Sequence, residues 1–325
     1  MPFLLIYIYD LVIFYKMNII RNIVNVQFDL PSSICIGNFD GIHIAHKKIL
    51  DRSVDLAKNN KCISIAITFN PHPLKYFGYD IKLLVTERKK IELIEKRAID
   101  NLIVLEFNEN LAKMSPEFFV EKFLVKKFNI KFLTIGYNYK FGDRNTGDVT
   151  LLKILSKKYN FDVYEFEKIT LKNTLVSSSN IRDLILSGNI ELANELLGHH
   201  YCLEGYVNKG QHIGKLLGFP TANIDVQNEL IPKFGVYATR VKINENYFPS
   251  VTNIGIKPTI QKDGNVYIEA HIINFEENIY DTFIELELIS YIREEKKFDN
   301  FNSLVEQMKK DKIKAINILQ HNQLI

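Results

Sequence analysis

The chain has 325 residues, of which 46% are hydrophobic and 24% are charged, a composition typical of a globular protein long enough for two domains. Its formal net charge of +3 is too small to indicate a nucleic acid or an anionic membrane as a partner. The three cysteines show no metal-ligand spacing and are typical of buried thiols in a reducing compartment, so we expect a cytoplasmic protein.

Residues 1–16 differ from the rest of the chain, because Pro2 to Tyr15 is an apolar and aromatic run broken by Asp10. The run is shorter than the roughly 20 residues of a spanning helix, and it lacks the basic start and cleavage site of a signal peptide. We interpret it as an extension upstream of a start at Met17, in which case no membrane partner is expected. A peripheral membrane anchor is the alternative.

From about Ile34 to Phe166, short apolar runs alternate with amphipathic segments, which predicts a doubly wound α/β domain with a parallel sheet. The expected strands are Ser33–Ile36, Cys62–Phe69, Leu102–Phe107, Phe132–Ile135 and Asp162–Phe166. Thr86 is expected to cap a helix that carries Ile91, Ile94 and Ala98 on one face, and Ser115-Pro116-Glu117 to begin another. Basic pairs such as Lys89-Lys90 are interpreted as solvated helix faces.

Asn180 to Leu197 is expected to be a helical connector, interrupted at Ser187-Gly188-Asn189. Beyond it, apolar and polar residues alternate with period two between turns, which predicts a small antiparallel barrel. Asn244-Glu245-Asn246 predicts a hairpin, and a helix near Phe301–Leu319 closes the chain. The expected strands are Tyr201–Val207, Gly235–Ile243, Tyr247–Ile254, Val266–Ile273 and Ile284–Tyr291.

A first candidate site lies in the stretch Ile36 to His46, which reads as a strand, a glycine turn and the start of a helix. Unpaired N–H groups at a helix N-terminus form an anion site, and glycines permit close approach of a phosphate. His43 and His46 are three residues apart and would share one face, where they could stabilise charge during adenylyl transfer. Two surface histidines on an ordinary helix are the alternative.

A second candidate is Ser177-Ser178-Ser179-Asn180-Ile181-Arg182, where hydroxyls precede a helix and Arg182 could hold a triphosphate. By itself the motif favours a helix cap followed by a solvated arginine, whereas together with the histidine site it suits a second wall of one ATP pocket. A third candidate begins with Gly210, Gly214 and Gly218, which suit a loop that approaches phosphates closely without forming a Walker A motif.

Thr221 and Asn223 follow that loop at strand spacing and would share one face, where their oxygens suit Mg²⁺ carried by ATP. A turn followed by a polar strand face is the alternative. Glu269 alternates with Ile268 and Ala270, so it points away from the apolar face. An exposed glutamate is the usual outcome at such a position.

In these stretches the sequence resembles the bacterial bifunctional riboflavin kinase/FAD synthetase family, from Met17 over nearly the whole chain. The order and spacing of the matching motifs make the resemblance specific. They are Gly37–His46, Thr68–Pro73, Gly136–Gly142, Ser177–Arg182, Leu216–Asn223 and Ile268–His271.

The resemblance implies two activities, in which ATP phosphorylates riboflavin to FMN and a second ATP adenylylates FMN to FAD, with Mg²⁺ required. It implies a Rossmann-like nucleotidylyltransferase domain over residues 17–186 and a barrel kinase domain with a C-terminal helix over residues 187–325. The oligomeric state is not indicated.

In the adenylyltransferase domain the resemblance implies that His43 and His46 contact the ATP phosphates and that Ser178 and Arg182 complete the site. In the kinase domain it implies that Glu269 takes the proton from the ribityl hydroxyl. Other implied ATP-binding residues are Gly37, Phe39, Asp40, Gly214, Lys215, Gly218, Pro220, Thr221 and Asn223, the last two also metal ligands. Implied flavin-binding residues are Phe77, Asn138, Phe141 and Arg293.

Three residues depart from the family pattern. Ala45 stands between the histidines where glycine is usual. Its methyl group is harmless at an ordinary helical φ but obstructive at a positive φ or where the backbone touches phosphate, and we expect it to be tolerated. Lys215 replaces an arginine, and Asp281 stands where glycine is common. Two alternatives therefore stay open, a riboflavin kinase whose adenylyl-transfer site is impaired and a non-catalytic flavin-binding protein.

Overall fold

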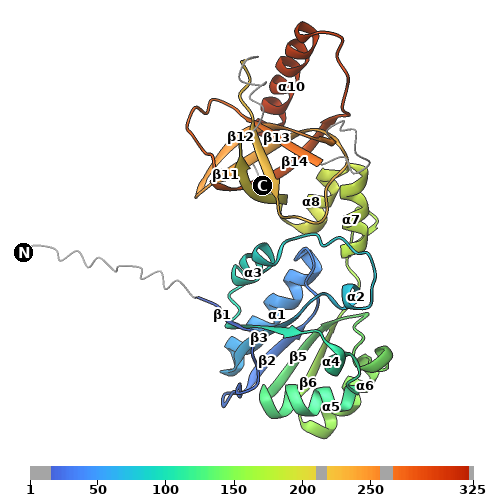
Figure 1. Ribbon diagram of the computed structural model, residues 1–325. Coiled ribbons are helices and arrows are strands. Elements are labelled where there is room, and N and C mark those ends of the chain that lie inside the picture. The colour runs from blue at the N-terminus through green and yellow to red at the C-terminus, as the bar shows by residue number, and fades with distance from the viewer. Residues whose placement is uncertain (1–15, 210–217, 257–265, 322–325) are drawn as a thin grey trace, which may run out of the picture. The chain divides into compact units, whose positions relative to one another are not determined.

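The computed structural model describes residues 16–209, 218–256 and 266–321 (Figure 1). The chain forms two compact units, each built from segments that are separated in sequence. The first unit contains the residues up to Asn38, Ile49–Gly78 and Ile91–Phe166, and the second contains Phe39–Lys48, Tyr79–Lys90 and the residues from Glu167 onward. The predictions made for residues 1–15, Gly210, Gly214 and Lys215 lie outside the described residues.

The first unit is built on a parallel sheet with the strand order β1-β4-β3-β2-β5-β6, which confirms the predicted α/β class. The five predicted strands are present with small shifts of their ends, and a short strand, β1, was not predicted. The strands are β1 (Asn18–Ile20), β2 (Ser32–Ile36), β3 (Ile63–Asn70), β4 (Asn101–Glu106), β5 (Ile130–Gly136) and β6 (Asp162–Phe166).

Helices cover both faces of this sheet (Figure 1). On one face, Ile34 and Ile36 of β2 join a core with the helices near residues 116–128 and 149–159. On the other, the hydroxyls of Ser33 and of Ser53 in α1 lie 3.2 Å apart, as expected from the alternation of side chains along a strand. The helices are α1 (Ile44–Asn60), α2 (Pro73–Tyr76), α3 (Glu87–Glu95), α4 (Glu109–Ala112), α5 (Pro116–Phe119), a π-helical segment (Val120–Lys127), a 3-10 turn (Asp143–Asn145) and α6 (Val149–Tyr159).

Two predicted helix boundaries can be compared with the structure. Ser115 caps α5 as predicted, because its hydroxyl accepts a hydrogen bond from Phe118 N at 3.2 Å. The prediction for α3 was wrong at its end, since the helix stops at Glu95 and Ala98 has a left-handed φ of 56°. Ala98 precedes the buried strand β4, and the chain turns there rather than continuing the helix.

The second unit contains a closed barrel of antiparallel strands in the order β10-β13-β12-β11-β14-β9, as the period-two pattern predicted. The two-residue turn Asn244-Glu245 joins β11 to β12, with Ile243 and Asn246 paired across it. The strands are β9 (Tyr201–Asn208), β10 (Ala222–Val226), β11 (Gly235–Ile243), β12 (Asn246–Ile256), β13 (Val266–Ile272) and β14 (Phe283–Arg293), with a separate hairpin of β7 (Thr170–Leu171) and β8 (Thr174–Leu175).

Helices pack on this barrel at two places. The predicted connector forms α7 (Ser178–Ser187) and α8 (Ile190–Leu197), separated by Gly188 with a φ of 85°. Helix α8 packs against β9 and β14, and α10 (Phe301–His321) packs against β11, β12 and β14. No helix in the described part of the chain is long and apolar enough to cross a lipid bilayer.

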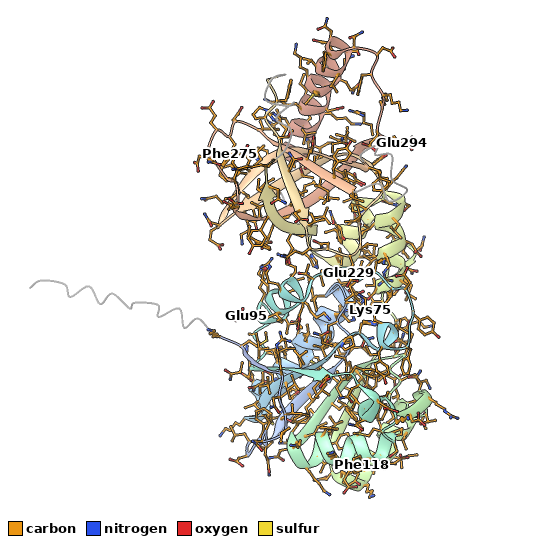
Figure 2. All side chains as sticks on the ribbon, viewed as in Figure 1. Lys75, Glu95, Phe118, Glu229, Phe275 and Glu294 are labelled. Carbon is orange, nitrogen blue, oxygen red and sulfur yellow. The ribbon has the colours of Figure 1, made fainter. Side chains whose placement is uncertain are left out.

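The segment Tyr79–Lys90 belongs to the second unit through polar contacts with residues far along the chain. Glu229, labelled in Figure 2, accepts a hydrogen bond from Leu83 N at 3.0 Å. Lys89 Nζ pairs with Glu285 at 2.6 Å, and Arg88 pairs with Glu204 as well as with Glu285. The prediction that Lys89 and Lys90 form a solvated face was wrong, since they are only 8% and 7% exposed. Ion pairing compensates the desolvation of Lys89.

Candidate active sites

The stretch from Gly37 to His46 forms a tight turn before α1. Three residues in it have positive φ, namely Phe39 at 50°, Gly41 at 85° and Ile42 at 41°. Such values are unfavourable for side chains with a Cβ and persist only where the surroundings hold them. Gly41 is needed for a second reason, because a Cβ there would lie 2.7 Å from Leu84 Cδ1.

Asp40 is the centre of the contacts that hold this turn. Its side chain accepts hydrogen bonds from Leu84 N at 2.8 Å and from Arg182 Nη2 at 2.8 Å, and its carbonyl accepts one from Ser178 Oγ at 2.9 Å. Burial raises the pKa of Asp40, while the Leu84 N–H and the Arg182 charge act in the opposite direction. Asp40 from one motif is thus brought together with Ser178 and Arg182 from another.

His43 and His46 stack on each other, with ring centroids 3.6 Å apart and an interplanar angle of 13°. Burial lowers the pKa of His43 to about 4 and that of His46 well below its usual value, so both rings are neutral near pH 7. The Nδ1 atom of His46 is buried and has no hydrogen-bond partner among the described residues. Ala45 lies inside α1 and is absent from the positive-φ residues, so its φ is not one at which the methyl group is obstructive.

Arg182 lies on α7 and is oriented by two hydrogen bonds. Besides contacting Asp40, its Nε donates to the Lys82 carbonyl at 2.8 Å, and its side chain is 14% exposed. The alternative of a solvated arginine is therefore wrong, whereas a phosphate contact stays a prediction. Ser177 caps the helix by accepting from Asn180 N at 3.2 Å.

Sequence reasoning missed two residues around this turn. Lys90 is buried, which lowers its pKa, while the negative charge of Asp40 acts in the opposite direction. His199 Nε2 lies 2.9 Å from the Gly41 carbonyl. Neither had a local signal, because Lys90 stands in a basic pair and His199 lies 158 residues from its partner.

The predicted flavin-binding residues of the first unit have different surroundings. Phe77 follows α2, is 58% exposed, and packs edge-on against Tyr76 and Phe107 at centroid distances of 5.2 and 5.8 Å. Asn138 lies in the turn after β5. Phe141 is buried in the core of the sheet domain, 5.5 Å from the ring of Tyr139. Of these residues, Phe77 is the one whose ring is freely presented to a ligand.

A second group of polar side chains lies on the barrel. Asn223 of β10 and Glu269 of β13 are paired directly across the two strands, and Glu269 pairs on its other side with Asn253 of β12. Paired residues project to the same face, and Thr221 precedes Asn223 by two residues, which also suits that face. Hydroxyl, amide and carboxylate oxygens are the ligands that Mg²⁺ prefers, so the residues fit such an ion.

The segment before Thr221 is held by a histidine that sequence reasoning quoted but did not assign. His271 Nδ1 donates a hydrogen bond to the Pro220 carbonyl at 2.9 Å, and its ring packs edge-on against Phe219. Its Nε2 and the Oδ1 of Asn253 are buried without a hydrogen-bond partner in the described parts of the chain. The position of His271, two residues after Glu269 on one strand face, is the signal that could have found it. Gly218 has a φ of 78° in open space.

Arg293, predicted to lie near the flavin, binds the C-terminal helix. Its Nε and Nη2 donate to Asp311 of α10 at 3.0 and 2.7 Å, and both side chains are largely buried. Its role towards flavin stays a prediction.

Comparison with known proteins assigns both parts of the chain. The FAD synthetase family model matches residues 26–180 and the riboflavin kinase model matches residues 197–319. A bifunctional riboflavin kinase/FMN adenylyltransferase of Buchnera aphidicola subsp. Schizaphis graminum is 38% identical, over 91% of this chain and 96% of that protein. One of the same name from Haemophilus influenzae is 34% identical, over 91% and 97%.

A crystal structure from Streptococcus pneumoniae, named a macrolide-efflux protein, has a TM-score of 0.84 at 24% identity, covering 93% of this chain and 99% of that chain. At that identity the likeness supports the fold alone. The parallel-sheet and barrel units with their two polar sites define a two-domain enzyme. Given its relatives, the chain belongs to the bifunctional riboflavin kinase/FMN adenylyltransferase family.

Proposed function

We propose that this protein converts riboflavin and ATP to FMN and then converts FMN and a second ATP to FAD and pyrophosphate. The observation that carries the proposal is the match of two family models, in order, to the two parts of one chain. The bifunctional relatives are matched over nearly their full length, which supports both activities in this chain. We assign adenylyl transfer to residues 17–186 and the kinase to residues 187–325, in the cytoplasm.

In adenylyl transfer, a phosphate oxygen of FMN attacks the α-phosphorus of ATP, and the bond to the β-phosphate breaks to release pyrophosphate. The turn of Gly37, Phe39 and Asp40 would approach the phosphates, with His43 and His46 on them. The two rings lie together in one stack, and their lowered pKa values keep them neutral near pH 7. This supports the role, because a neutral imidazole can donate an N–H group to developing negative charge. Ser178 and Arg182 complete the ATP site, and they already hold Asp40.

In the kinase reaction, the ribityl 5′-oxygen of riboflavin attacks the γ-phosphorus of ATP and ADP leaves. Glu269 takes the hydroxyl proton. Mg²⁺ carried by ATP would be held by Thr221 and Asn223, and it would neutralise charge on the transferred group. The pairing of Asn223 with Glu269 supports this assignment, since it puts the base beside the metal ligand. The remaining ATP contacts are assigned to Gly214, Lys215, Gly218 and Pro220.

Phe77, Asn138 and Phe141 are assigned to FMN in adenylyl transfer, and Arg293 to riboflavin in the kinase. Exposure of the Phe77 ring supports its part, because an aromatic ring presented to solvent can stack on the flavin. Phe141 is buried in the core of the sheet domain and Arg293 is paired with Asp311, so these two would border the flavin from positions fixed by neighbouring structure.

The first experiment is incubation of the protein with riboflavin, ATP and Mg²⁺, with flavins separated over time. FMN that appears and then gives way to FAD is the expected result. FMN alone would leave the kinase and remove adenylyl transfer, as in the impaired-site alternative. Bound but unconverted riboflavin would favour a flavin-binding protein. Glu269→Gln should abolish FMN formation while riboflavin still binds.

A further inference from the structure

A histidine outside the segment matched by the FAD synthetase model contacts the candidate adenylyl-transfer turn. His199 follows α8 and lies in the segment that the riboflavin kinase model matches. Its Nε2 lies 2.9 Å from the carbonyl oxygen of Gly41, two residues before His43. A carbonyl only accepts, so this contact is a hydrogen bond in the tautomer that carries its proton on Nε2.

The end of α8 is held against the start of α1 by a second contact. Lys47 Nζ donates to the Gly198 carbonyl at 2.7 Å. Gly198 has a φ of 66°, and a Cβ there would lie 2.8 Å from Ile44 Cγ2, so the glycine lets the end of α8 pack closely on the Ile44 side chain. The place of His199 is therefore fixed by backbone geometry as well as by its own hydrogen bond.

The hydrogen bond to Gly41 fixes the direction of the next peptide group. The Gly41–Ile42 peptide is trans, because the only cis peptide in the described residues is Asn70–Pro71. In a planar trans peptide the C=O and N–H groups point in opposite directions. Holding the Gly41 carbonyl therefore sets the direction of the Ile42 N–H, at the left-handed residue that leads into His43.

The turn is held on its other side by the contacts of Asp40. Leu84, Ser178 and Arg182 fix the Asp40 side chain and carbonyl, and all three residues precede the kinase segment. At the Gly41 carbonyl, the contact comes from His199. The other ring nitrogen, Nδ1, lies 3.0 Å from the His200 carbonyl. Because burial lowers the pKa of His199, the neutral ring donates to one of these two carbonyls.

We propose that His199 is a positioning residue for adenylyl transfer, whose Nε2–H bond to Gly41 sets the turn that carries His43 and His46. A side chain of the kinase segment thus completes the adenylyl-transfer site. This inference rests on the proposed function, and it adds a residue that acts through the backbone without touching substrate. Misplacement of a catalytic group by about 1 Å costs on the order of 100-fold in rate.

The test compares His199→Leu with His199→Gln in the full chain, measuring FMN and FAD formation separately. Leucine removes the donor, whereas the Gln amide can still donate to Gly41. We expect His199→Leu to lower kcat for FAD formation by roughly ten- to hundredfold with a smaller change in KM for ATP, and His199→Gln to recover most of it. Riboflavin phosphorylation should stay unchanged in both variants, which reports that the barrel is folded.

The same two substitutions at the neighbouring His200, which pairs with Glu287 at 3.3 Å, are the matched control. Equal FAD formation by wild type and His199→Leu would overturn the inference, and so would equal losses in the Leu and Gln variants. Loss of both activities in His199→Leu would show a structural role instead. A wild-type protein that makes FMN and no FAD would remove adenylyl transfer itself, and the inference with it.

Discussion

Asn223 and Glu269 are 46 residues apart in sequence and directly opposite each other on β10 and β13, with Asn253 on the far side of Glu269. The pairing joins two motifs that were assigned separate tasks, metal binding and proton removal. Because the strands fix the register, neither side chain can shift along its strand without moving the whole ladder. The barrel therefore holds the positions of Asn223, Asn253 and Glu269 rigidly relative to one another.

Asn223→Val should raise the Mg²⁺ concentration needed for FMN formation by tenfold or more, since loss of a metal-site group typically costs this much in metal affinity. Valine keeps the strand propensity of β10, so folding should be retained. The measurement is a Mg²⁺ titration of initial rates at saturating ATP. Asp225→Asn, on the same strand at an exposed position, is the control. An unchanged Mg²⁺ requirement in Asn223→Val would exclude Asn223 as a ligand.

His271 should act on the kinase through Pro220. His271→Leu removes the donor to the Pro220 carbonyl, which precedes Thr221, whereas the side-chain amide of His271→Asn can replace Nδ1–H. We expect a several-fold rise in KM for ATP in the Leu variant and near-normal values in the Asn variant. FAD formation from supplied FMN should be the same in both. Identical kinetics of the two variants would refute the role of this hydrogen bond.

The stability of the protein should fall as the pH drops from about 6.5 to 4. The pKa of His43 is about 4 in the folded chain and near 6.5 when unfolded. Within this window the unfolded chain therefore binds more protons, and the free energy of unfolding decreases as pH falls. His43 alone lowers the free energy of unfolding by on the order of 3 kcal/mol across this window. Burial also lowers the pKa values of His46, His199 and His271, which acts in the same direction.

Urea unfolding at a series of pH values measures this effect. His43→Asn should show a weaker dependence between pH 6.5 and 4, whereas His321→Asn, at an exposed position, should follow the wild type. A pH dependence unaltered by His43→Asn would show that His43 is not buried as a neutral ring.

Asp311→Ala should destabilise the packing of α10 on the barrel. The substitution leaves Arg293 buried without its carboxylate, and breaking a buried ion pair in this way costs about 3–5 kcal/mol. The exposed pair of Glu306 with Lys309 is the comparison, and Glu306→Gln should cost less than about 1 kcal/mol. Thermal unfolding of the two variants measures both losses of stability. Equal losses in Asp311→Ala and Glu306→Gln would mean that the Arg293–Asp311 pair is solvated.

The sequence was sufficient to predict the strands that lie in the interior of both units, because apolar runs and strict alternation report burial directly. It was insufficient for β1, which has three residues and offers too short a pattern, and for β10, whose side chains are mostly half-buried and show no clear apolar alternation. The turn of Gly37–His46 was found because glycines and histidines cluster locally. The positive φ values of Phe39 and Ile42 in this turn were not predicted, since they depend on contacts with residues far along the chain.

The errors that concern buried charged groups and histidines share one physical cause. Lys89 was interpreted as solvated, but its carboxylate partner, Glu285, lies 196 residues away. His199 and His271 were passed over because a single histidine carries no local signal. A sequence pattern reports which residues are apolar or polar, whereas the partner that makes a buried charge or imidazole stable comes from the tertiary fold.

The hydrogen bond between Gly41 and His199 has a consequence for the order of synthesis. Gly41 leaves the ribosome 158 residues before His199, which at ordinary elongation rates is a delay of roughly 8–30 s. During that time the sheet can begin to form around β2, whereas the turn lacks its donor from His199. The nascent protein should therefore reach its full rate of adenylyl transfer only after α8 and His199 have emerged, although His43 and His46 are made long before.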